Sequence, residues 1–469
     1  MLDFLRAFQK KKLAVLGYGE EGRSTASFFF ENGLSVTILD ADESLKDKLG
    51  VRDNATFKGG TGYLSDLEKF DLVFRSPGFP RRHPRILAAE KKGVKITSQT
   101  KFFFEHCPSP IIGVTGTKGK GTCAELIFKI LSDTGQETYL GGNIGRPSLD
   151  FLSRLSEDSK VVLELSSFQL EDLEQSPCVA VVLNIFPDHL NYHENFEEYV
   201  KAKANILKHQ SAVDIAVLDA DNSASKRLFF STPAKKFWVS DKFKAEPGGY
   251  YAVGRLFVDV GGEENEIASV AELSLLGRHN WKNILAASVA CRSLNVPLGL
   301  IRQNVKSYAG PAHHHLELVG AIDGVRFYDD SAATVPQAAI AAIKTFSEPK
   351  ILILGGSDKG QEYRELASAV AANRVKCVIL IGEVASKISL ELSALGFSGK
   401  KITGLKDISK VVLAARACAE RGDVVLLSPG AASFGMFANA KDRGEQFSRE
   451  VGKLKNIDHV PDERKDKTV

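Results

Sequence analysis

The sequence has no long apolar runs. None approaches the roughly 20 residues that a membrane-spanning helix requires. The first residues also lack the apolar core of a signal peptide, because Asp3 comes early and lysines follow at 10–12. We therefore expect a cytoplasmic protein without a membrane span.

The sequence also lacks an excess of charge of one sign. It has 61 Lys and Arg against 58 Asp and Glu, which gives a net charge of +3. Because nucleic-acid binding needs a strongly basic surface, this balance argues against nucleic acid as a partner. We expect small-molecule partners and a monomeric protein.

Cysteine and proline are scarce. The six cysteines include no Cys-x-x-Cys pair, so the sequence predicts neither a zinc ribbon nor a disulfide framework, and we expect reduced thiols. Only 16 prolines accompany 40 glycines, a balance that favours tight strand–helix turns over disordered linkers.

Short Val/Ile/Leu runs alternate with helical stretches along almost the whole chain. Most of these runs are continuously apolar, which is typical of parallel strands covered on both faces. Their alternation with helices predicts α/β domains with right-handed crossovers. The runs lie at residues 13–16, 36–39, 72–74, 111–114, 161–165, 179–185, 351–354, 378–381 and 424–427.

The length of 469 residues suggests about three domains of roughly 150 residues each. Two segments have the composition of domain joints, Cys-Pro-Ser-Pro at 107–110 and Ser-Tyr-Ala-Gly-Pro at 307–311. They predict domains at residues 1–109, 110–308 and 309–469.

A first glycine-rich loop follows the earliest apolar run. Gly17, Gly19 and Gly22 form a Gly-x-Gly-x-x-Gly pattern between a predicted strand and a predicted helix, and the next strand leads to Asp40. The glycines permit a tight turn and close approach of a phosphate to the helix N-terminus. Asp40 can accept a hydrogen bond from a sugar hydroxyl. The pattern predicts a bound nucleotide without saying which one.

A second glycine-rich loop follows the run at 111–114. Backbone N–H groups of such a loop surround phosphates, and Lys120 can reach the terminal ones, so the loop predicts ATP binding. The strict Gly-x4-Gly-Lys-Ser/Thr pattern is not met, because Val114 stands at the first glycine position and Gly121 follows the lysine. Thr122 is then the available ligand for Mg²⁺. The loop consists of Gly116, Thr117, Lys118, Gly119, Lys120, Gly121 and Thr122.

Acidic and basic side chains follow other apolar runs. Glu164 lies at the end of the run at 161–165, and a carboxylate there suits Mg²⁺ bound to phosphate oxygens. Lys359 and Ser433 each follow a later run, where a cation and a hydroxyl can hold an amino-acid carboxylate. Lys203, judged from its neighbours alone, is a solvated helix lysine.

Several segments, taken in order, resemble the Mur ligase superfamily. The resemblance covers almost the whole chain, and Glu-Leu-Ser-Ser-Phe-Gln-Leu points to the branch that adds D-glutamate. The segments are Gly-Thr-Lys-Gly-Lys-Gly-Thr (116–122), Gly-Gly-Asn-Ile-Gly (141–145), Glu-Leu-Ser-Ser-Phe-Gln-Leu (164–170), Leu-Asn-Ile-Phe-Pro-Asp-His-Leu (183–190), Tyr-Val-Lys-Ala-Lys (199–203), Leu-Gly-Arg-His-Asn (276–280), Asp-Asp-Ser-Ala-Ala-Thr (329–334), Gly-Gly-Ser-Asp-Lys (355–359) and Leu-Ser-Pro-Gly-Ala-Ala-Ser (427–433).

The resemblance implies three domains: a Rossmann-like domain for a UDP sugar, a central P-loop ATPase-type domain with a mostly parallel sheet, and a C-terminal Rossmann-like domain for the amino acid. It also implies a step of peptidoglycan biosynthesis, on which cell shape and division depend. ATP phosphorylates the carboxylate of UDP-N-acetylmuramoyl-L-alanine, and the amine of D-glutamate attacks the acyl phosphate.

The resemblance further implies roles for individual residues. Lys120, Glu164, His189 and a carbamylated Lys203 form the catalytic set. Two Mg²⁺ ions are implied, one on Thr122 and Glu164 and a second near His189 and Lys203. Besides the glycine loop, Asn283 and Asp330 contact ATP, and Thr334, Lys359 and Ser433 hold the amino acid. The UDP-sugar residues are Gly17, Gly19, Glu20, Glu21, Gly22, Asp40, Ser76, Pro77, Gly78, Asn143 and His189.

Four positions depart from the family pattern. Gly121 replaces a hydroxyl residue, His315 an arginine, Ala332 a lysine and Ala440 an aromatic residue. These changes leave open a related ligase for another amino acid, a folylpolyglutamate-type ligase, or a non-catalytic sensor of UDP-muramyl precursors. A nucleotide-linked oxidoreductase does not explain the second glycine loop.

Overall fold

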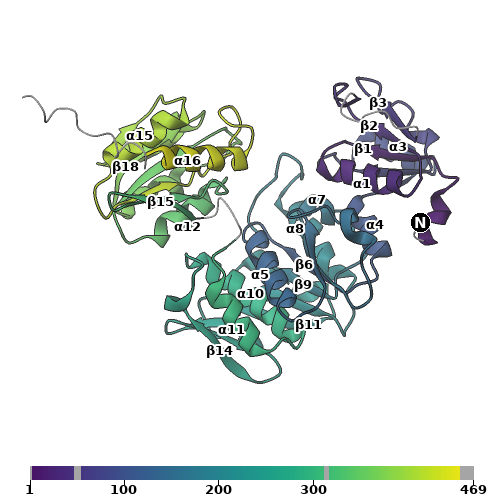
Figure 1. Cartoon of the computed structure of the whole chain (residues 1–469), viewed down its shortest axis with the longest axis horizontal. Coiled ribbons are helices and arrows are strands. Elements are labelled where there is room, and N and C mark those ends of the chain that lie inside the picture. Colours follow the sequence, from purple (N-terminus) through teal and green to yellow (C-terminus); the bar gives the residue numbers. More distant parts are fainter. Residues whose placement is uncertain (1–2, 47–53, 311–315, 455–469) are drawn as a thin grey trace, which may run out of the picture. The chain divides into compact units, whose positions relative to one another are not determined.

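The computed structural model describes residues 3–46, 54–310 and 316–454, which form three α/β domains, each around one sheet (Figure 1). The chain is gathered into two compact units. The first comprises the described residues of Met1–Leu273 and Trp281–Tyr308, and the second those of Ser274–Asn280 and Ala309–Val469. The exact boundaries at 109 and 309 stay a prediction.

The first sheet has five parallel strands in the order β3-β2-β1-β4-β5. All four residues of β1 and of β4 are buried, because helices and loops cover both faces of the sheet. The strands are β1 (Leu13–Leu16), β2 (Val36–Leu39), β3 (Ala55–Lys58), β4 (Leu72–Arg75) and β5 (Lys95–Thr97). The helices are η1 (Asp3–Phe8), α1 (Glu20–Glu31), η2 (Leu67–Lys69), α3 (Pro84–Lys91) and α4 (Gln99–His106).

The second sheet has nine strands in the order β14-β13-β12-β11-β10-β9-β6-β8-β7. It is parallel from β7 to β12 and antiparallel only at β12-β13-β14. The strands are β6 (Ile111–Thr115), β7 (Thr138–Gly142), β8 (Lys160–Glu164), β9 (Val179–Val182), β10 (Ile215–Asp219), β11 (Lys235–Ser240), β12 (Gly248–Ala252), β13 (Arg255–Asp259) and β14 (Glu264–Ser269). The helices are α5 (Lys120–Ser132), α6 (Leu149–Leu152), α7 (Ser167–Leu170), α8 (Phe196–Lys208), α9 (Ser223–Arg227), η3 (Leu228–Ser231), η4 (Val270–Glu272), α10 (His279–Ser293) and α11 (Leu298–Ser307).

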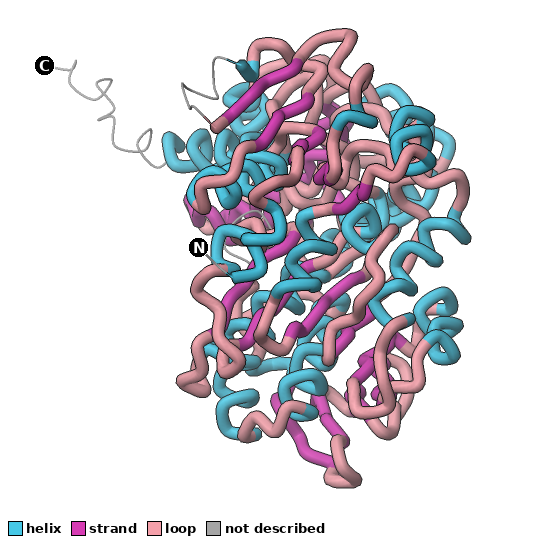
Figure 2. Tube along the Cα trace, turned by 90° about the vertical axis from the view of Figure 1, so that its right-hand side faces the viewer, coloured by secondary structure: helices cyan, strands magenta, loops and turns pink. Residues whose placement is uncertain are grey.

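The third sheet has six strands in the order β15-β16-β20-β17-β18-β19, with only the β15–β16 pair antiparallel. Figure 2 shows the strands lying among the helices and loops that flank them. The strands are β15 (Glu317–Ile322), β16 (Val325–Asp329), β17 (Lys350–Gly355), β18 (Val375–Ile381), β19 (Lys400–Ile402) and β20 (Val424–Leu427). The helices are α12 (Pro336–Thr345), α13 (Arg364–Ala372), α14 (Ala385–Ala394), α15 (Ile408–Cys418) and α16 (Ala440–Leu454).

The predicted mostly parallel α/β architecture is confirmed. Each predicted apolar run overlaps a strand. In the run at 179–185 the strand, β9, ends already at Val182. Within the described ranges, no helix is both long and apolar enough to cross a membrane. All six cysteines are free thiols, as expected.

Candidate active site

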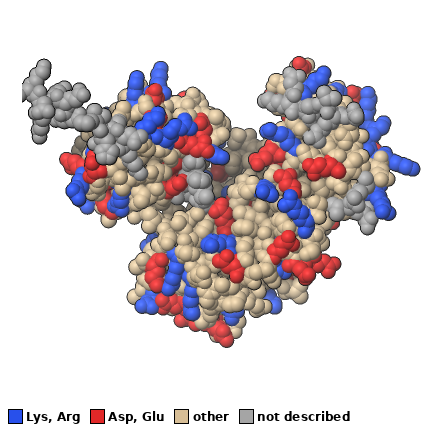
Figure 3. Space-filling view, in the orientation of Figure 1, with Lys and Arg blue, Asp and Glu red and all other residues tan. Residues whose placement is uncertain are grey.

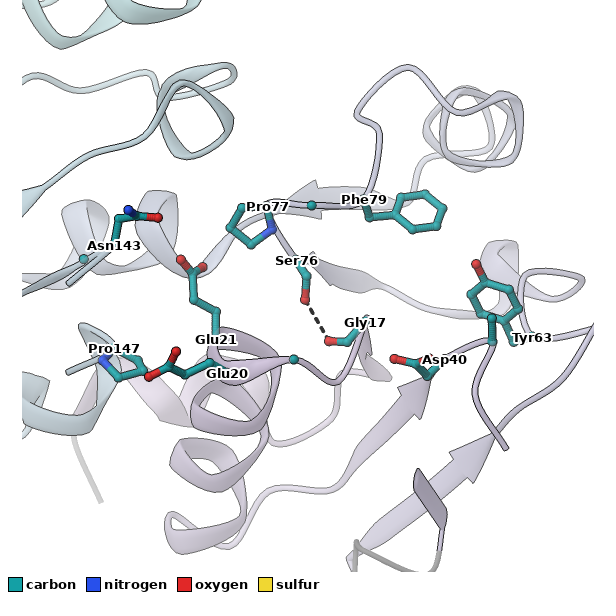
Figure 4. A pocket seen from close by; sticks show the side chains of 14 residues that line it. Gly17, Glu20, Glu21, Asp40, Tyr63, Ser76, Pro77, Phe79, Asn143 and Pro147 are labelled. Carbon is teal, nitrogen blue, oxygen red and sulfur yellow. Dashed lines mark hydrogen bonds between the residues drawn. The ribbon is translucent and has the colours of Figure 1, made fainter. Parts of the chain in front are cut away.

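A cavity of about 480 Å³ lies at the carboxyl edge of the first sheet, where β1 and β4 are neighbours (Figure 4). Parallel sheets bind ligands at this edge. Nine of the residues predicted for a UDP sugar line the cavity, whereas Gly22 and His189 do not. The nine are Gly17, Gly19, Glu20, Glu21, Asp40, Ser76, Pro77, Gly78 and Asn143.

The first glycine loop is held in place by close backbone packing. A side chain at Gly22 would put its Cβ 1.9 Å from the carbonyl oxygen of Gly17, so only glycine fits there. The hydroxyl of Ser76 donates a hydrogen bond to the same Gly17 oxygen at 2.7 Å. Gly22 therefore supports the conformation of the loop by packing against Gly17, although Gly22 does not itself line the cavity.

Asp40 lies beyond the end of β2 and is already engaged by the backbone. One carboxylate oxygen accepts a hydrogen bond from the N–H of Tyr18 at 2.7 Å, and the other accepts from Asp42 at 3.0 Å. Each oxygen keeps a second lone pair for a ligand hydroxyl. Asp40 thus orders the loop as well as facing the cavity.

Sequence reasoning missed five residues of the cavity wall. Gly142 directly precedes Asn143 in the Gly-Gly-Asn motif, and Phe79 directly follows the predicted turn at 76–78, so both could have been found by extending those motifs. Tyr63 lies in an irregular segment with no pattern that could have marked it. The five are Ala41, Tyr63, Phe79, Gly142 and Pro147.

The second glycine loop joins β6 to α5 at the edge of the second sheet. Gly119 precedes the helix with φ +88°, and a Cβ there would lie 2.2 Å from Oδ1 of Asn283 on α10. Lys120 donates to the carbonyl oxygen of Thr117 at 3.1 Å. The loop therefore needs glycine at 119, and it places the predicted adenine residue Asn283 next to the predicted phosphate residues.

The segment that follows β9 also hydrogen-bonds to this glycine loop. The carbonyl oxygen of Asn184 accepts from the N–H of Thr117 at 2.6 Å, and its side-chain oxygen accepts from the N–H of Lys118 at 3.0 Å. The hydroxyl of Thr117 also hydrogen-bonds to Tyr199 on α8 at 3.1 Å. The predicted strand ends early because this segment pairs with the loop instead.

Glu164, the last residue of β8, is a buried carboxylate beside the loop. Its Oε1 accepts a hydrogen bond from Asn143 at 2.8 Å, and its Oε2 lies 3.2 Å from where a Cβ on Gly121 would be. Thr122, in the first turn of α5, is also buried. Glu164 thus borders both the glycine loop and the cavity residue Asn143.

Lys203 on α8 is buried, which corrects the interpretation of this residue as a solvated lysine. Its Nζ donates to the carbonyl oxygen of Gly116 at 2.9 Å and lies 4.8 Å from the centre of the Tyr199 ring. Burial, together with the positive charge of Lys120, holds the pKa of Lys203 well below its usual range. A buried amine whose charged form is disfavoured therefore lies directly under the glycine loop.

His189 follows β9 with φ +55°, and its side chain is 43% exposed. Its ring contacts Phe168 with the centroids 4.9 Å apart, and its Nε2 lies 3.8 Å from a carboxylate oxygen of Asp188. In the described part of the chain, no three His, Cys, Asp or Glu side chains gather closely enough to hold a metal ion by themselves.

In the second unit, Asp330 follows β16 and is buried. It accepts a hydrogen bond from the hydroxyl of Ser428 at 2.6 Å, and burial raises its pKa to about 8. The buried guanidinium of Arg443 donates from Nε to Ser331 at 2.8 Å. Sequence reasoning did not single out Arg443, because a helix arginine gives no sign of such burial.

The predicted amino-acid residues lie on neighbouring loops of the second unit. Ser357 pairs with Ala432 through a backbone hydrogen bond of 2.8 Å, which joins the loops that carry Lys359 and Ser433. The Nζ of Lys359 lies 5.8 Å from the centre of the Phe434 ring. The N–H of Gly430 donates to Ala333 at 2.8 Å, next to Thr334.

Two of the departures from the family pattern lie in the described part of the second unit. Ala440 is the first residue of α16, and its carbonyl oxygen accepts from Ser331 at 2.7 Å. Ala332 lies in the turn after β16, where its carbonyl oxygen accepts from the N–H of Thr334 at 2.9 Å. His314 and His315 fall outside the described residues.

Comparison with known protein families gives three matches. Residues 11–98 match the Mur ligase MurD-like N-terminal domain, residues 114–291 the Mur ligase middle domain, and residues 314–430 the Mur ligase glutamate ligase domain. Together these matches span most of the chain.

Individual proteins that are similar to this chain belong to the same family. The UDP-N-acetylmuramoylalanine–D-glutamate ligase of Acetivibrio thermocellus is 39% identical, over 96% of this chain and 98% of its own length. The same-named enzyme of Symbiobacterium thermophilum is 39% identical, over 95% and 98%. The solved UDP-N-acetylmuramate-alanine ligase MurC of Thermotoga maritima shares the fold, with a TM-score of 0.61 at 19% identity over 96% of this chain and 100% of that one. The chain therefore belongs to the Mur ligase family and is most like its MurD members.

Proposed function

We propose that this protein is an ATP-dependent ligase that joins D-glutamate to UDP-N-acetylmuramoyl-L-alanine in peptidoglycan biosynthesis. The observation that carries the proposal is the meeting of the glycine loop, buried Glu164 and buried Lys203 at one edge of the second sheet. The identity of the substrates is supported by the two D-glutamate ligases that match nearly the whole chain.

The reaction proceeds in two transfers. The γ-phosphoryl group moves from ATP to the alanine carboxylate, and ADP leaves. The amine of D-glutamate then attacks the acyl carbon, forming a C–N bond as the C–O bond to phosphate breaks and the amine loses a proton. Backbone N–H groups of residues 119–122, at the N-terminus of α5, hold the ATP phosphates, since those of Thr117 and Lys118 donate to Asn184, while Lys120 offsets the negative charge of the phosphates.

The donor groups fit Mg²⁺, which prefers a few carboxylate or hydroxyl ligands together with phosphate oxygens. Thr122 and Glu164 would hold an ion on ATP. His189 and a carbamylated Lys203 would hold a second ion near the substrate carboxylate. When bound, Mg²⁺ neutralises the charge of the phosphoryl group and of the acceptor carboxylate.

Carbamylation of Lys203 requires a neutral amine, because the nitrogen lone pair forms the new N–C bond with CO₂ and one proton is released. Burial lowers the pKa of Lys203 and so favours this form. The carbamate would convert a cation into a carboxylate-like ligand beside the glycine loop.

The remaining predicted residues fit the other substrates. The cavity residues from Gly17 to Asn143 bind the UDP sugar, and His189 approaches its acyl end. Asn283 and Asp330 contact ATP. Thr334, Lys359 and Ser433 bind the carboxylates of D-glutamate, on loops held together by backbone hydrogen bonds.

We also propose that the enzyme is a cytoplasmic monomer without a nucleic-acid partner. Lys/Arg and Asp/Glu side chains are interspersed on the visible face of each part rather than gathered by sign (Figure 3). Light scattering should give a mass near 51.0 kDa at micromolar concentration. A mass near twice that value would overturn the monomer.

The deciding experiment is a phosphate-release assay with UDP-N-acetylmuramoyl-L-alanine, ATP, Mg²⁺ and a panel of amino acids, with product mass measured in parallel. We expect release and a ligated product with D-glutamate. Lys120→Ala should reduce turnover by at least about 100-fold, whereas Lys129→Ala, on the exposed side of the same helix, should not.

Other outcomes would point elsewhere. Turnover with a different amino acid and not with D-glutamate would show that the enzyme is specific for that amino acid. The alanines at 332 and 440, which depart from the family pattern, would then be the first residues to test as the cause. Tight binding of the UDP sugar without turnover on any amino acid would indicate a precursor sensor.

A further inference from the structure

Glu21 is an acidic residue in a place that suits an anion. It lies in the first turn of α1, whose N-cap residue Gly19 supplies no capping side chain. Helix N-termini attract phosphates through their free N–H groups and dipole. In Figure 4 the Glu21 side chain points between Asn143 and Pro77 on the cavity wall.

One side of the Glu21 carboxyl group is held by protein and the other is not. Gln169 on α7 donates to Oε1 at 2.6 Å. Oε2 is buried and has no hydrogen-bond partner among the residues that the structure describes. A buried carboxylate oxygen left unpaired is costly, so this atom calls for a donor or for a proton of its own.

Two charged groups act on Glu21. Glu20 precedes it on α1 and adds a like charge, whereas Arg75 at the end of β4 attracts it. Arg75 is shared with the acids that follow α7, since its Nη2 lies 3.8 Å from Glu171 and 3.5 Å from Asp172. Burial is the largest influence and raises the pKa of Glu21 to about 7.

We propose that Glu21 is a positioning residue for the UDP sugar and acts in its protonated form. The protonated carboxyl donates from Oε2 to an oxygen of the diphosphate diester at the N-terminus of α1. The ionised carboxylate offers only acceptors and repels that oxygen. Binding of the UDP sugar is thereby coupled to uptake of one proton, a coupling that rests on the UDP-sugar site of the proposed function.

The coupling predicts the direction of the pH dependence. Above about pH 7 the free protein must gain a proton to bind, so Kd should rise by up to about tenfold per pH unit. Below that pH the proton is already present, and Kd should level off. The ligand's diphosphate diester does not titrate in this range and cannot cause the slope.

Two substitutions separate the role of the proton from that of the charge. Glu21→Gln keeps the shape and provides a permanent N–H donor, so its Kd should stay nearly constant between about pH 6 and pH 8. Glu31→Gln removes a negative charge from the exposed C-terminal end of the same helix, outside the cavity, and should keep the slope of the parent protein. Thermal unfolding of both variants checks that they are folded.

The experiment is titration calorimetry with UDP-N-acetylmuramoyl-L-alanine at about pH 6 and pH 8, the latter in two buffers of different ionisation enthalpy. We expect proton uptake for the parent protein and for Glu31→Gln, and none for Glu21→Gln. A pH-independent parent, or a Glu21→Gln variant with the parent's slope, overturns the coupling while leaving the proposed function intact. Absence of UDP-sugar binding at every pH overturns both.

Discussion

The amine of Lys203 lies inside the second domain, 2.9 Å from the carbonyl oxygen of Gly116 and 3.3 Å from the hydroxyl of Thr115. Both partners only accept hydrogen bonds from it, and no carboxylate among the described residues is hydrogen-bonded to the amine. Desolvation and the neighbouring Lys120 therefore disfavour its charged form. Such lysines are the ones that react with electrophiles.

We expect Lys203→Ala to lower turnover by about 100-fold, because the proposed metal ligand would be absent, and added bicarbonate should not restore turnover. Lys201→Ala changes an exposed lysine on the same helix and should leave turnover unchanged. The parent protein in ¹³C-bicarbonate should show a carbamate NMR signal that Lys203→Ala lacks. Parent-like turnover of Lys203→Ala would show that this role is wrong.

Asp330 gives a prediction about stability. Burial raises its pKa from 3.8 to about 8, so the folded protein binds a proton that the unfolded chain releases between these values. The stability of the second unit should therefore fall as pH rises through that window. Asp330→Asn keeps an acceptor for Ser428 and removes the titration.

We expect Asp330→Asn to raise the unfolding temperature of the second unit at both pH values, by several degrees at pH 8 and by much less at pH 5, because less of the window between the two pKa values has been crossed at pH 5. Differential scanning calorimetry at the two pH values measures this. An equal shift at both values would mean that ionisation of Asp330 is not the cause.

At the scale of elements, α5 and α10 meet at the glycine loop. Gly119 and Asn283 can lie this close to each other only because glycine has no side chain. The φ of +88° adds a second reason for glycine, because other residues adopt it only with strain. The conformation of the glycine loop and the position of Asn283 on α10 therefore depend on each other.

Gly119→Ala should weaken ATP binding at least tenfold, since the added methyl group must displace Asn283 or the loop. Gly135→Ala is the matched control, because Gly135 has φ +82° but open space around its Cβ position. It should cost about 1 kcal/mol of stability through backbone strain and leave ATP affinity unchanged. Isothermal titration with a non-hydrolysable ATP analogue compares them, and equal affinities would contradict the steric explanation.

At the scale of the whole molecule, each unit buries an apolar core of its own. The first unit has a core that includes Phe29, Phe74 and Phe102, and the second has cores around Phe327 and Phe447 and around Leu352 and Leu380. Because each unit has its own core, we do not expect a single two-state unfolding transition.

We predict two calorimetric transitions. UDP-N-acetylmuramoyl-L-alanine should raise only the transition of the first unit, because a ligand stabilises the part to which it binds. The Asp330→Asn shift identifies the other transition. One transition that moves as a whole with the ligand would indicate that the units unfold together.

Several features could be predicted from the sequence. Leu13–Leu16 is predicted and observed as one strand, because a continuously apolar run between a lysine run and a glycine turn has no other stable place than a buried parallel strand. Glycine at 22 follows from its close contact with the backbone of Gly17, and glycine at 17 from its φ of +88°. Tyr63 could not be predicted, since it comes from an irregular segment that the fold brings to the cavity.

The sequence by itself determined the α/β class, the two glycine loops and the family, because these depend on local periodicity and on motifs of a few residues. Only the tertiary structure decided the chemical state of individual side chains. Lys203, Glu21 and Asp330 have ordinary sequence neighbours, and their pKa values depart from the usual range because distant segments remove water from them. Desolvation is a property of the folded chain, and no local pattern encodes it.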